Sequence, residues 1–303
     1  MTSASQGFEH LAALFALYER RLEVTRTMGE LVVNRLLDAD TVAIRDVVCG
    51  GACRHDDDEE CSETTHLVFP YRGVFLRHVG RNDAVAEANQ VLFFNQAEAY
   101  RISHPIAGDD ACLSLTVGAS VLAELAPREQ VRDPGALVFR RQRLRIDPRA
   151  QALVALLRHS LSRNAMETLE AETLALTLVR RALGERTAHA TRARGGRQKL
   201  VDRAKLVLSS DPARRWTLAG IAGEVGVSPV YLTQTFQQVE AVPLYRYQLR
   251  LRLARALDLL GEYDDLTTLA MDLGFSSHSH FSATFRQTYG RTPTAFQRSA
   301  HLR

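Results

Sequence analysis

The C-terminal third of the 303-residue chain contains an internal repeat, and this feature constrains the fold more than any other. The first copy, LAGIAGEVGVSPVYLTQTF, covers residues 218–236, and the second, LTTLAMDLGFSSHSHFSATF, covers residues 266–285. After the glycine the second copy has one extra residue. The matched positions are Leu218, Ile221, Ala222, Val225, Gly226, Leu232 and Phe236 with Leu266, Leu269, Ala270, Leu273, Gly274, Phe281 and Phe285.

Each copy carries the residues that a helix–turn–helix requires. A small alanine lets two helices cross closely, a glycine ends the first helix in the left-handed conformation, and a serine caps the second helix. These residues are Ala222, Gly226 and Ser228 in the first copy, and Ala270, Gly274, Ser276 and Ser277 in the second. The repeat therefore predicts two helix–turn–helix motifs, each with a second helix free to enter a major groove.

The charge distribution singles out the same part of the chain. Residues 190–303 carry 16 Lys and Arg against 9 Asp and Glu, whereas residues 1–189 carry 22 against 26. A basic third joined to an acidic remainder indicates a polyanionic partner for the basic third. A plain helical bundle would explain one glycine–serine turn, but two copies within the basic third favour DNA binding.

The rest of the chain divides into a β-rich segment, a helical segment and a linker. Short runs rich in Val, Ile, Leu, Phe and Thr predict strands over residues 41–146, and hence a small barrel or sandwich. Leucines at helical spacing predict helices over residues 148–183, which either cap the barrel or pair between subunits. Residues 184–198 are expected to form a flexible linker, and residues 8–17 fit a short amphipathic helix. The expected fold class is α+β.

The sequence carries no sign of membrane insertion or export. No apolar run approaches the roughly 20 residues of a membrane span, and the N-terminus lacks a secretory pattern. We therefore expect a cytoplasmic protein. Four cysteines in 303 residues are too few for a secreted disulfide scaffold, so free thiols, metal ligands or a redox role are favoured.

Residues 199–303 resemble the DNA-binding domain of the AraC/XylS family of transcription regulators. The residues that carry the resemblance are Tyr247, Arg252, Ala256, Leu259, Leu260, Leu269, Ala270, Gly274, Phe275, Phe281, Phe285, Arg286, Gly290 to Pro293, and Phe296. The chain departs from the family pattern at Gln237, where Lys or Arg is usual, at Ala241, where glycine is usual, and at Gln297, where arginine is common. These departures weaken the expected phosphate contacts of the first motif and leave the fold prediction unchanged.

The resemblance implies a sequence-specific transcription regulator with a sensing half. In such a protein a cupin-like β-barrel with flanking helices senses a small ligand or a metal ion, and the following helices form a homodimer. The expected domains are residues 1–183 for sensing and dimerisation, 184–198 for the linker, and 199–303 for AraC-type DNA binding. The implied partners are double-stranded DNA, a second copy of the chain, the effector and RNA polymerase, with no membrane.

A cupin enzyme fused to a DNA-binding domain is the competing class. Metal-dependent cupins generally show a His-x-His pair on a strand, and the predicted barrel has none. His278 and His280 have that spacing but belong to the second helix–turn–helix. The sequence also lacks a nucleophile elbow, a phosphate loop and a paired-carboxylate signature, so we expect no enzyme activity.

The outward positions of the two second helices are the candidate DNA contacts. Gln234 can pair with an adenine edge, and Thr233 and Val230 can touch a thymine methyl. The full set is Val230, Thr233, Gln234, Gln237, His278, Ser279, Ser282, Ala283 and Arg286, with Arg214, Arg215, Arg246, Arg250 and Arg252 as candidate phosphate partners. Two motifs on one face predict a half-site of about two helical turns, with segments roughly 10 bp apart.

The segment VCGGACRHDDDEECSETTH, residues 48–66, holds three of the four cysteines. Thiolate and imidazole ligands together suit tetrahedral Zn²⁺ or another soft metal. The predicted ligands are Cys49, Cys53 and Cys61, completed by Cys112 or a histidine, with His66 preferred to His55. A redox-sensing thiol switch and unrelated free cysteines are the alternatives. The acidic run 56–60 disfavours a reactive thiol, because nearby carboxylates raise a cysteine's pKa.

Overall fold

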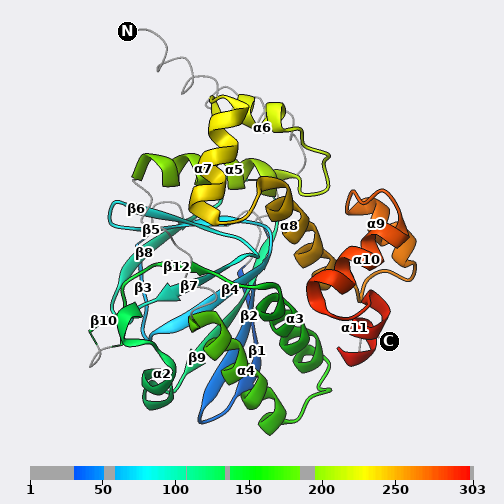
Figure 1. The fold of residues 1–303 in the computed structure, drawn as a ribbon. Helices are drawn as coiled ribbons and strands as arrows, with labels where there is room; N and C mark the ends of the chain where they lie inside the picture. The colour runs from blue at the N-terminus through cyan, green and yellow to red at the C-terminus, as the bar shows by residue number, and fades with distance from the viewer. Residues whose placement is uncertain (1–30, 51–58, 107, 134–136, 185–194, 301–303) are drawn as a thin grey trace.

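The computed structural model describes residues 31–50, 59–106, 108–133, 137–184 and 195–300. Figure 1 shows a β-rich half, blue to green, beside a helical half, yellow to red. Helices α3 (Pro148–Ser162) and α4 (Thr168–Leu183) lie beside the sheets of the β-rich half, and both fall in the range 148–183 where the leucine spacing predicts helices. The predicted helix over residues 8–17 lies outside the described residues.

The strands of the β-rich half form two main antiparallel sheets. The large sheet has the order β1-β2-β9-β4-β7-β12, and the small sheet has the order β3-β8-β5-β6. The strands of the large sheet are β1 (Leu31–Asp38), β2 (Val42–Cys49), β9 (Asp110–Val117), β4 (His66–Arg72), β7 (Gln90–Phe94) and β12 (Arg143–Arg145). Those of the small sheet are β3 (Glu60–Cys61), β8 (Ala99–Ser103), β5 (Phe75–Val79) and β6 (Asn82–Ala86). A separate short ladder joins β10 (Val131–Asp133) to β11 (Val138–Phe139).

The central strands of the large sheet are covered on both faces, since alternate residues of a strand point to opposite sides and each side packs on other elements, whereas the edge strand β1 is largely exposed. One face packs on α2 (Ala119–Leu125), α3 and α4 through residues such as Ile44, Leu115 and Leu178. The other face packs on the small sheet, in a second core formed by Val68, Phe75, Ala86, Leu92, Phe94 and Cys112. The long continuous buried runs of β4 and β7 follow from this double covering.

The closed cupin-like barrel expected from the resemblance is not found among the described residues. No described ladder joins the edge strands of the large sheet, β1 and β12, to those of the small sheet, β3 and β6. The strands instead form two facing sheets that are held together by the apolar side chains between them. The β-rich α+β class is thus confirmed, and the arrangement is that of a sandwich.

The helical half contains the two predicted helix–turn–helix motifs. The first consists of α6 (Leu218–Val225) and α7 (Pro229–Glu240), and the second consists of α9 (Leu266–Asp272) and α10 (His278–Tyr289). The long helix α8 (Leu244–Leu259) joins them, α5 (Gly195–Ser210) precedes the first, and α11 (Pro293–Ser299) follows the second. Helix α5 begins four residues before residue 199, the expected start of this domain.

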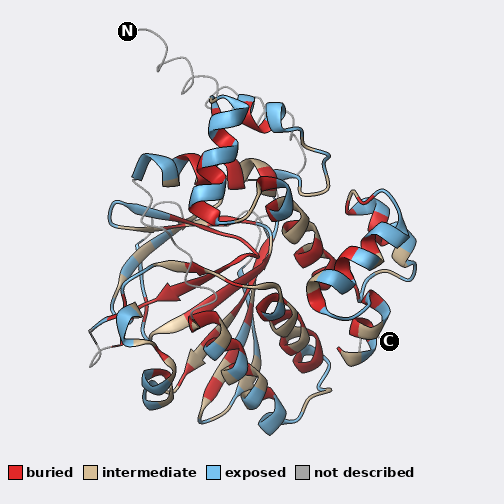
Figure 2. Ribbon diagram, in the orientation of Figure 1, coloured by how far each residue is buried: buried red, intermediate tan, exposed pale blue. Residues whose placement is uncertain are grey.

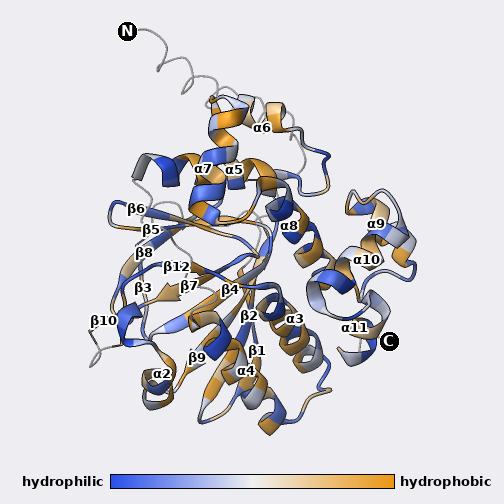
Figure 3. Cartoon of the chain, in the orientation of Figure 1, coloured by the Kyte–Doolittle hydropathy of each residue, from blue (hydrophilic) through white to orange (hydrophobic). Residues whose placement is uncertain are grey.

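The two halves pack against each other along α8. The core of the second motif includes Ala155 of α3, with Ala152 and Leu156 packed beside it. The first motif has a core of its own, in which Tyr247 and Phe236 meet edge to face. Figure 2 shows buried residues along α8, which lies next to the β-rich half, and Figure 3 shows hydrophobic and hydrophilic residues interspersed along the helices of the helical half. Among the described helices, none is both long and apolar enough to cross a membrane.

Candidate nucleic-acid interface and its attachment to the β-rich half

The first helix–turn–helix has the turn that its sequence predicts. The Thr217 side chain caps α6 by accepting from the Gly220 N–H, and Gly226 ends that helix at φ +69°. Ser228 then accepts from the Tyr231 N–H, with Pro229 at the first position of α7. Each backbone end is therefore satisfied by a residue that the repeat singled out or by its neighbour.

The second motif is built in the same way. Asp265 caps α9 by accepting from the N–H groups of Thr267 and Thr268, and these bonds lower the pKa of Asp265 to about 2. Gly274 takes φ +76°, and Ser277 caps α10 by accepting from the His280 N–H. The apolar pair Phe281 and Phe285 is fully buried, as predicted.

The predicted DNA contacts lie on the outer faces of α7 and α10. Val230, Thr233, Gln234 and Gln237 are exposed on α7; His278, Ser279, Ala283 and Arg286 are exposed on α10, and Ser282 is half-buried. His278 Nε2 lies 3.2 Å from Ser282 Oγ, one turn along the same helix. Tyr231 is also exposed beside Val230, at 46%. Tyr231 is not among the DNA contacts predicted from the sequence, and its exposure adds it to the outer face of α7.

Arg252 connects the two motifs. Its guanidinium donates to the carbonyl oxygens of Pro212, Ala213 and Arg214, before the first motif, and to that of Gly274, in the turn of the second. All three guanidinium nitrogens are used in these bonds. Arg252 therefore has a structural role, which is to fix the spacing of the two motifs, and this role competes with the predicted contact to phosphate.

The other candidate phosphate partners differ in exposure. Arg214 and Arg246 are exposed, and the Arg214 guanidinium lies 4.1 Å from the centre of the Trp216 ring. Arg215 is exposed next to Arg214. Arg250 is half-buried, and burial lowers its pKa. The exposed members of this candidate set therefore lie in the loop before α6 and at the start of α8.

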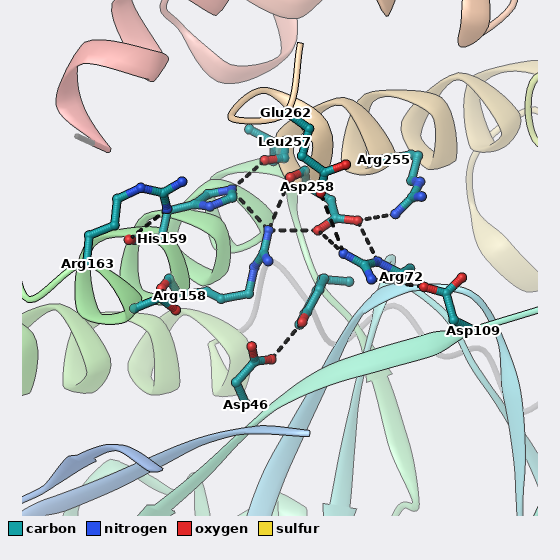
Figure 4. A network of polar contacts seen from close by, with 12 residues as sticks. Asp46, Arg72, Asp109, Arg158, His159, Arg163, Arg255, Leu257, Asp258 and Glu262 are labelled. Carbon is teal, nitrogen blue, oxygen red and sulfur yellow. Dashed lines mark hydrogen bonds and ion pairs between the residues drawn. The ribbon is translucent and has the colours of Figure 1, made fainter. Parts of the chain in front are cut away.

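A buried carboxylate at the end of α8 joins the helical half to the β-rich half. Asp258 accepts from Arg72 of β4, from Arg158 of α3 and from Arg255 of α8 itself (Figure 4). The distances from Asp258 are 2.9 Å to Arg72 Nε and 2.7 Å to Arg158 Nη2. The three guanidinium groups hold the pKa of Asp258 below its usual range despite its burial. Removing one partner of such a buried network costs about 3–5 kcal/mol, because a charge is left unpaired.

Further polar contacts lie next to the Asp258 network. The Tyr71 hydroxyl donates to Asp46 at 2.6 Å, and the Arg158 guanidinium lies over the Tyr71 ring. His159 Nε2 lies 2.8 Å from the Leu257 carbonyl, and burial together with Arg158 lowers the pKa of His159 to about 4. A cavity of about 10 Å³ beside this network is lined by both halves, including Ala155 and Leu257. That volume suits one water and excludes an organic effector.

A second set of polar contacts attaches the first motif. The Tyr247 hydroxyl of α8 donates to Glu87, which is fully buried and has its pKa raised by burial. Lys205 of α5 pairs with Glu240 at the end of α7, at 2.6 Å. On the same side, the pair Arg143–Asp202 joins β12 to α5 at 2.6 Å. Neither set of contacts was predicted from the sequence. The one local signal is Asp258, a lone carboxylate in the leucine-rich run ARALDLL.

The predicted metal ligands are distributed over the β-rich half. Asp110 lies opposite Cys49, whereas Thr116 lies opposite His66. Asp110 and Thr116 are six residue steps apart, which is about 20 Å along the strand, so Cys49 and His66 cannot share one ion. Cys61 is exposed on β3 in the small sheet, and Cys53 lies outside the described residues. Cys112 is buried on the same strand as Asp110, two residues along.

The structure brings together a different group of potential ligands. Cys49, His104 and Asp110 each offer a ligand atom, and these atoms all lie within 4.8 Å of one another. His104 Nε2 is 3.2 Å from Asp110 Oδ2. Burial and the neighbouring Asp109 carboxylate raise the pKa of Asp110 to about 7. Of the predicted ligands, Cys49 alone belongs to this group.

Comparison with known proteins identifies the helical half. A helix–turn–helix domain family model matches residues 221–299. The transcriptional regulator GadX of Escherichia coli O6:H1 is 36% identical over 92 residues, which cover 30% of this chain and 33% of that protein. A crystal structure of a transcriptional regulator with an AraC-type DNA-binding domain, from Chromobacterium violaceum, is 30% identical, covers 35% of this chain and 96% of that one, and has a TM-score of 0.34. This chain belongs to the AraC/XylS family.

The likeness to curated AraC/XylS relatives extends unevenly along the chain. The activator RhaR of Klebsiella pneumoniae is 29% identical over 150 residues, which cover 48% of this chain and 52% of that protein. The chain spans about a third of the length of GadX and half of that of RhaR. The family assignment therefore rests on the AraC-type domain, the part that contains both helix–turn–helix motifs.

Proposed function

We propose that the protein is a sequence-specific DNA-binding regulator of transcription whose β-rich half senses an effector and acts on the AraC-type domain through α8. The observation that carries this proposal is the pair of helix–turn–helix motifs with exposed outer faces, joined by the four carbonyl contacts of Arg252. A rigid pair of reading helices in the basic third suits two successive major-groove segments.

The role of α8 as a relay is supported by the contacts at both of its ends. Tyr247, near its start, binds Glu87 of the β-rich half, and Asp258, near its end, binds Arg72 and Arg158. A movement of the β-rich half would therefore move α8, the helix that separates the two motifs. An effector would act by favouring one of two arrangements of these contacts over the other.

Further partners follow from the family. The protein is proposed to act as a homodimer on two half-sites in the cytoplasm and to contact RNA polymerase, with the cupin-like identity of the β-rich half remaining a prediction. The curated relatives are transcriptional regulators, which supports a function without enzymatic turnover. The exposed apolar side chain of Leu169 on α4, at 75%, supports the helices after the sheet as the dimer surface.

Footprinting and fluorescence anisotropy on DNA bound by the full chain test the proposal. We expect protection of two groove segments about one helical turn apart per half-site. Gln234→Ala should weaken binding by about 1–3 kcal/mol at one base position and little elsewhere. Binding that is equally weak on all DNA sequences, or protection of a single groove segment, would contradict the proposal.

The salt dependence of binding separates the two roles that arginines can have. Arg214→Ala should reduce the slope of log affinity against log salt concentration by about 1, as the loss of one phosphate contact does. Arg252→Ala should lower the affinity while leaving that slope unchanged, because the side chain holds backbone carbonyls. Equal reductions of the slope in both variants would assign Arg252 to phosphate.

A further inference from the structure

Three chemically reactive side chains meet where the two sheets of the β-rich half come together. Cys49 is the last residue of β2, Asp110 is the first residue of β9 directly opposite it, and His104 follows the end of β8. Their ligand atoms lie within 4.8 Å of one another. Cys49 is far in sequence from His104 and Asp110, which flank one turn, and the DNA-binding function proposed above uses none of the three.

The cluster lies in a protected setting. Cys49 is 4% exposed and Asp110 is 7% exposed, and the His104 side chain is 12% exposed. The ring of Phe75 meets the His104 imidazole edge to face, at 6.5 Å between ring centres. Two of the three residues stand on paired strands of the large sheet. Their backbone positions are therefore fixed before any ligand arrives, as a specific site requires.

The donor atoms select the class of ligand. A thiolate, an imidazole and a carboxylate together suit Zn²⁺ and related borderline-soft cations, whereas Mg²⁺ and Ca²⁺ take oxygen ligands. Ligand atoms bound tetrahedrally at about 2.0–2.3 Å to one ion lie roughly 3.3–3.8 Å apart. The atoms of the cluster lie within 4.8 Å of one another, so side-chain movements of about 1 Å would bring them to that geometry.

We propose that Cys49, His104 and Asp110 form a binding site for a divalent cation of the Zn²⁺ class, and that this cation is the effector of the regulator. The site rests on its own geometry, while the effector role rests on the function proposed above. With three protein ligands, one tetrahedral position is left for water or for a further ligand.

The cluster is joined to the AraC-type domain by a short path. Asp109, the neighbour of Asp110, accepts from Arg72 at 2.9 Å, and the same guanidinium donates to Asp258 of α8. Gly73, next to Arg72, takes φ +63°, and a Cβ added there would lie 2.4 Å from the Asp109 carbonyl oxygen. Because the backbones are in such close contact, a cation that draws Asp110 inward also moves Asp109 and acts on the Arg72–Asp258 pair.

Metal titration of the untagged full chain tests the site directly. Zn²⁺ binding is measured by calorimetry against a chelator, and Co²⁺ is used as a spectroscopic probe of thiolate coordination. We expect one equivalent of metal in the wild-type protein. Cys49→Ser, His104→Asn and Asp110→Asn should each weaken Zn²⁺ binding at least 10-fold, and Cys49→Ser should abolish the thiolate-to-cobalt absorption.

Cys61→Ser and His66→Asn are the matched controls, because they remove the same ligand types at positions outside the cluster. Unchanged Zn²⁺ affinity in both controls supports the site. Loss of binding in the controls, or retention of wild-type affinity in the three cluster variants, overturns it. Thermal unfolding of each apoprotein identifies a variant that fails to fold, and Asp110→Glu, which keeps the carboxylate, then serves as the second variant and should retain metal.

DNA affinity with and without Zn²⁺ tests the effector role. We expect at least a 5-fold change in the wild-type protein and none in Cys49→Ser. Metal that binds at the cluster without changing DNA affinity overturns the effector role. A chain that binds no specific DNA in either state overturns the proposed function instead, and the metal titration still decides the site.

Discussion

The turn glycines of the two helix–turn–helix motifs occupy equivalent places in the repeat and very different surroundings. A Cβ added at Gly226 would meet nothing within 4 Å, whereas one added at Gly274 would lie 2.0 Å from the carbonyl oxygen of Ala213. Both residues have a positive φ, so both need glycine's freedom. Only the second also needs the space, because the loop before the first motif lies against it.

The attachments of the motifs to the β-rich half differ in the same way. The first motif keeps a separate apolar core, and its side of the helical half is held by polar pairs such as Tyr247–Glu87 and Arg143–Asp202. The second motif shares its core with Ala155 of α3 and is held by the Asp258 network. A repeat that is regular in sequence is therefore supported by two different kinds of interaction.

Gly274→Ala should have the largest effect. The new methyl group combines the cost of a left-handed alanine with a clash against backbone, which together amount to about 4 kcal/mol of unfolding free energy. Gly226→Ala is the matched control and should cost only about 1 kcal/mol, from the backbone conformation alone. Urea unfolding of both variants measures the difference, and equal losses would contradict the contrast drawn here.

Acid should weaken the attachment of the second motif. The pKa of His159 is about 4 in the folded protein and about 6.5 in an unfolded chain. Between these values the unfolded chain binds a proton that the folded one does not. The stability is therefore present above pH 6.5 and is lost as the pH falls to about 4, by about 3 kcal/mol at most.

The control for this titration is His159→Gln, which removes the titrating group. The difference in unfolding free energy between wild type and this variant should change across pH 6.5 to 4 and stay constant above pH 7. Hydrogen exchange, corrected for its intrinsic pH dependence, should rise in α9 and α10 before α6 and α7. If both motifs opened at the same pH, their attachments to the β-rich half would not be independent.

The helix ends after α7 and α10 provide the smallest test. Ala241 ends α7 at φ +52°, where Gly290 ends α10 at φ +79°. Ala241→Gly should raise the unfolding free energy by about 0.5–1 kcal/mol, because glycine adopts this conformation without strain. Gly290→Ala should lower it by a similar amount. Chemical denaturation measures both changes. If Ala241→Gly did not stabilise the protein and Gly290→Ala did not destabilise it, the left-handed helix ends would not favour glycine.

The sequence predicted those features that depend on neighbouring residues. The turns at Gly226 and Gly274, the cap at Ser228 and the buried pair Phe281 and Phe285 are each set by a few adjacent positions, and all are confirmed. The regularity of the repeat made these local signals readable. The departure at Ala241 was also visible in the sequence, and the structure supplies its physical meaning as a left-handed helix end.

Features that depend on strand register could not be predicted in the same way. Asp110 becomes the neighbour of Cys49 only through the pairing of β2 with β9, and a shift of one residue would turn it to the other face. Proximity in sequence instead suggested Cys61 and His66 as ligands, and the fold carries them elsewhere. The Arg72–Asp258 pair is 186 residues apart, so the lone carboxylate in ARALDLL marks Asp258 as unusual but nothing near it in sequence identifies Arg72 as its partner.

The apolar core that Ala155 shares with the second motif bears on how such chains exchange parts during evolution. Recombination within the segment between the halves would give a new partner a DNA-binding domain whose Leu257 and Leu260 belong to a core completed by α3. A transplanted domain would therefore expose part of that core unless the new sensing half supplied a helix of similar shape. A unit that exchanges without loss of stability would therefore have to extend past the apparent domain boundary and include α3.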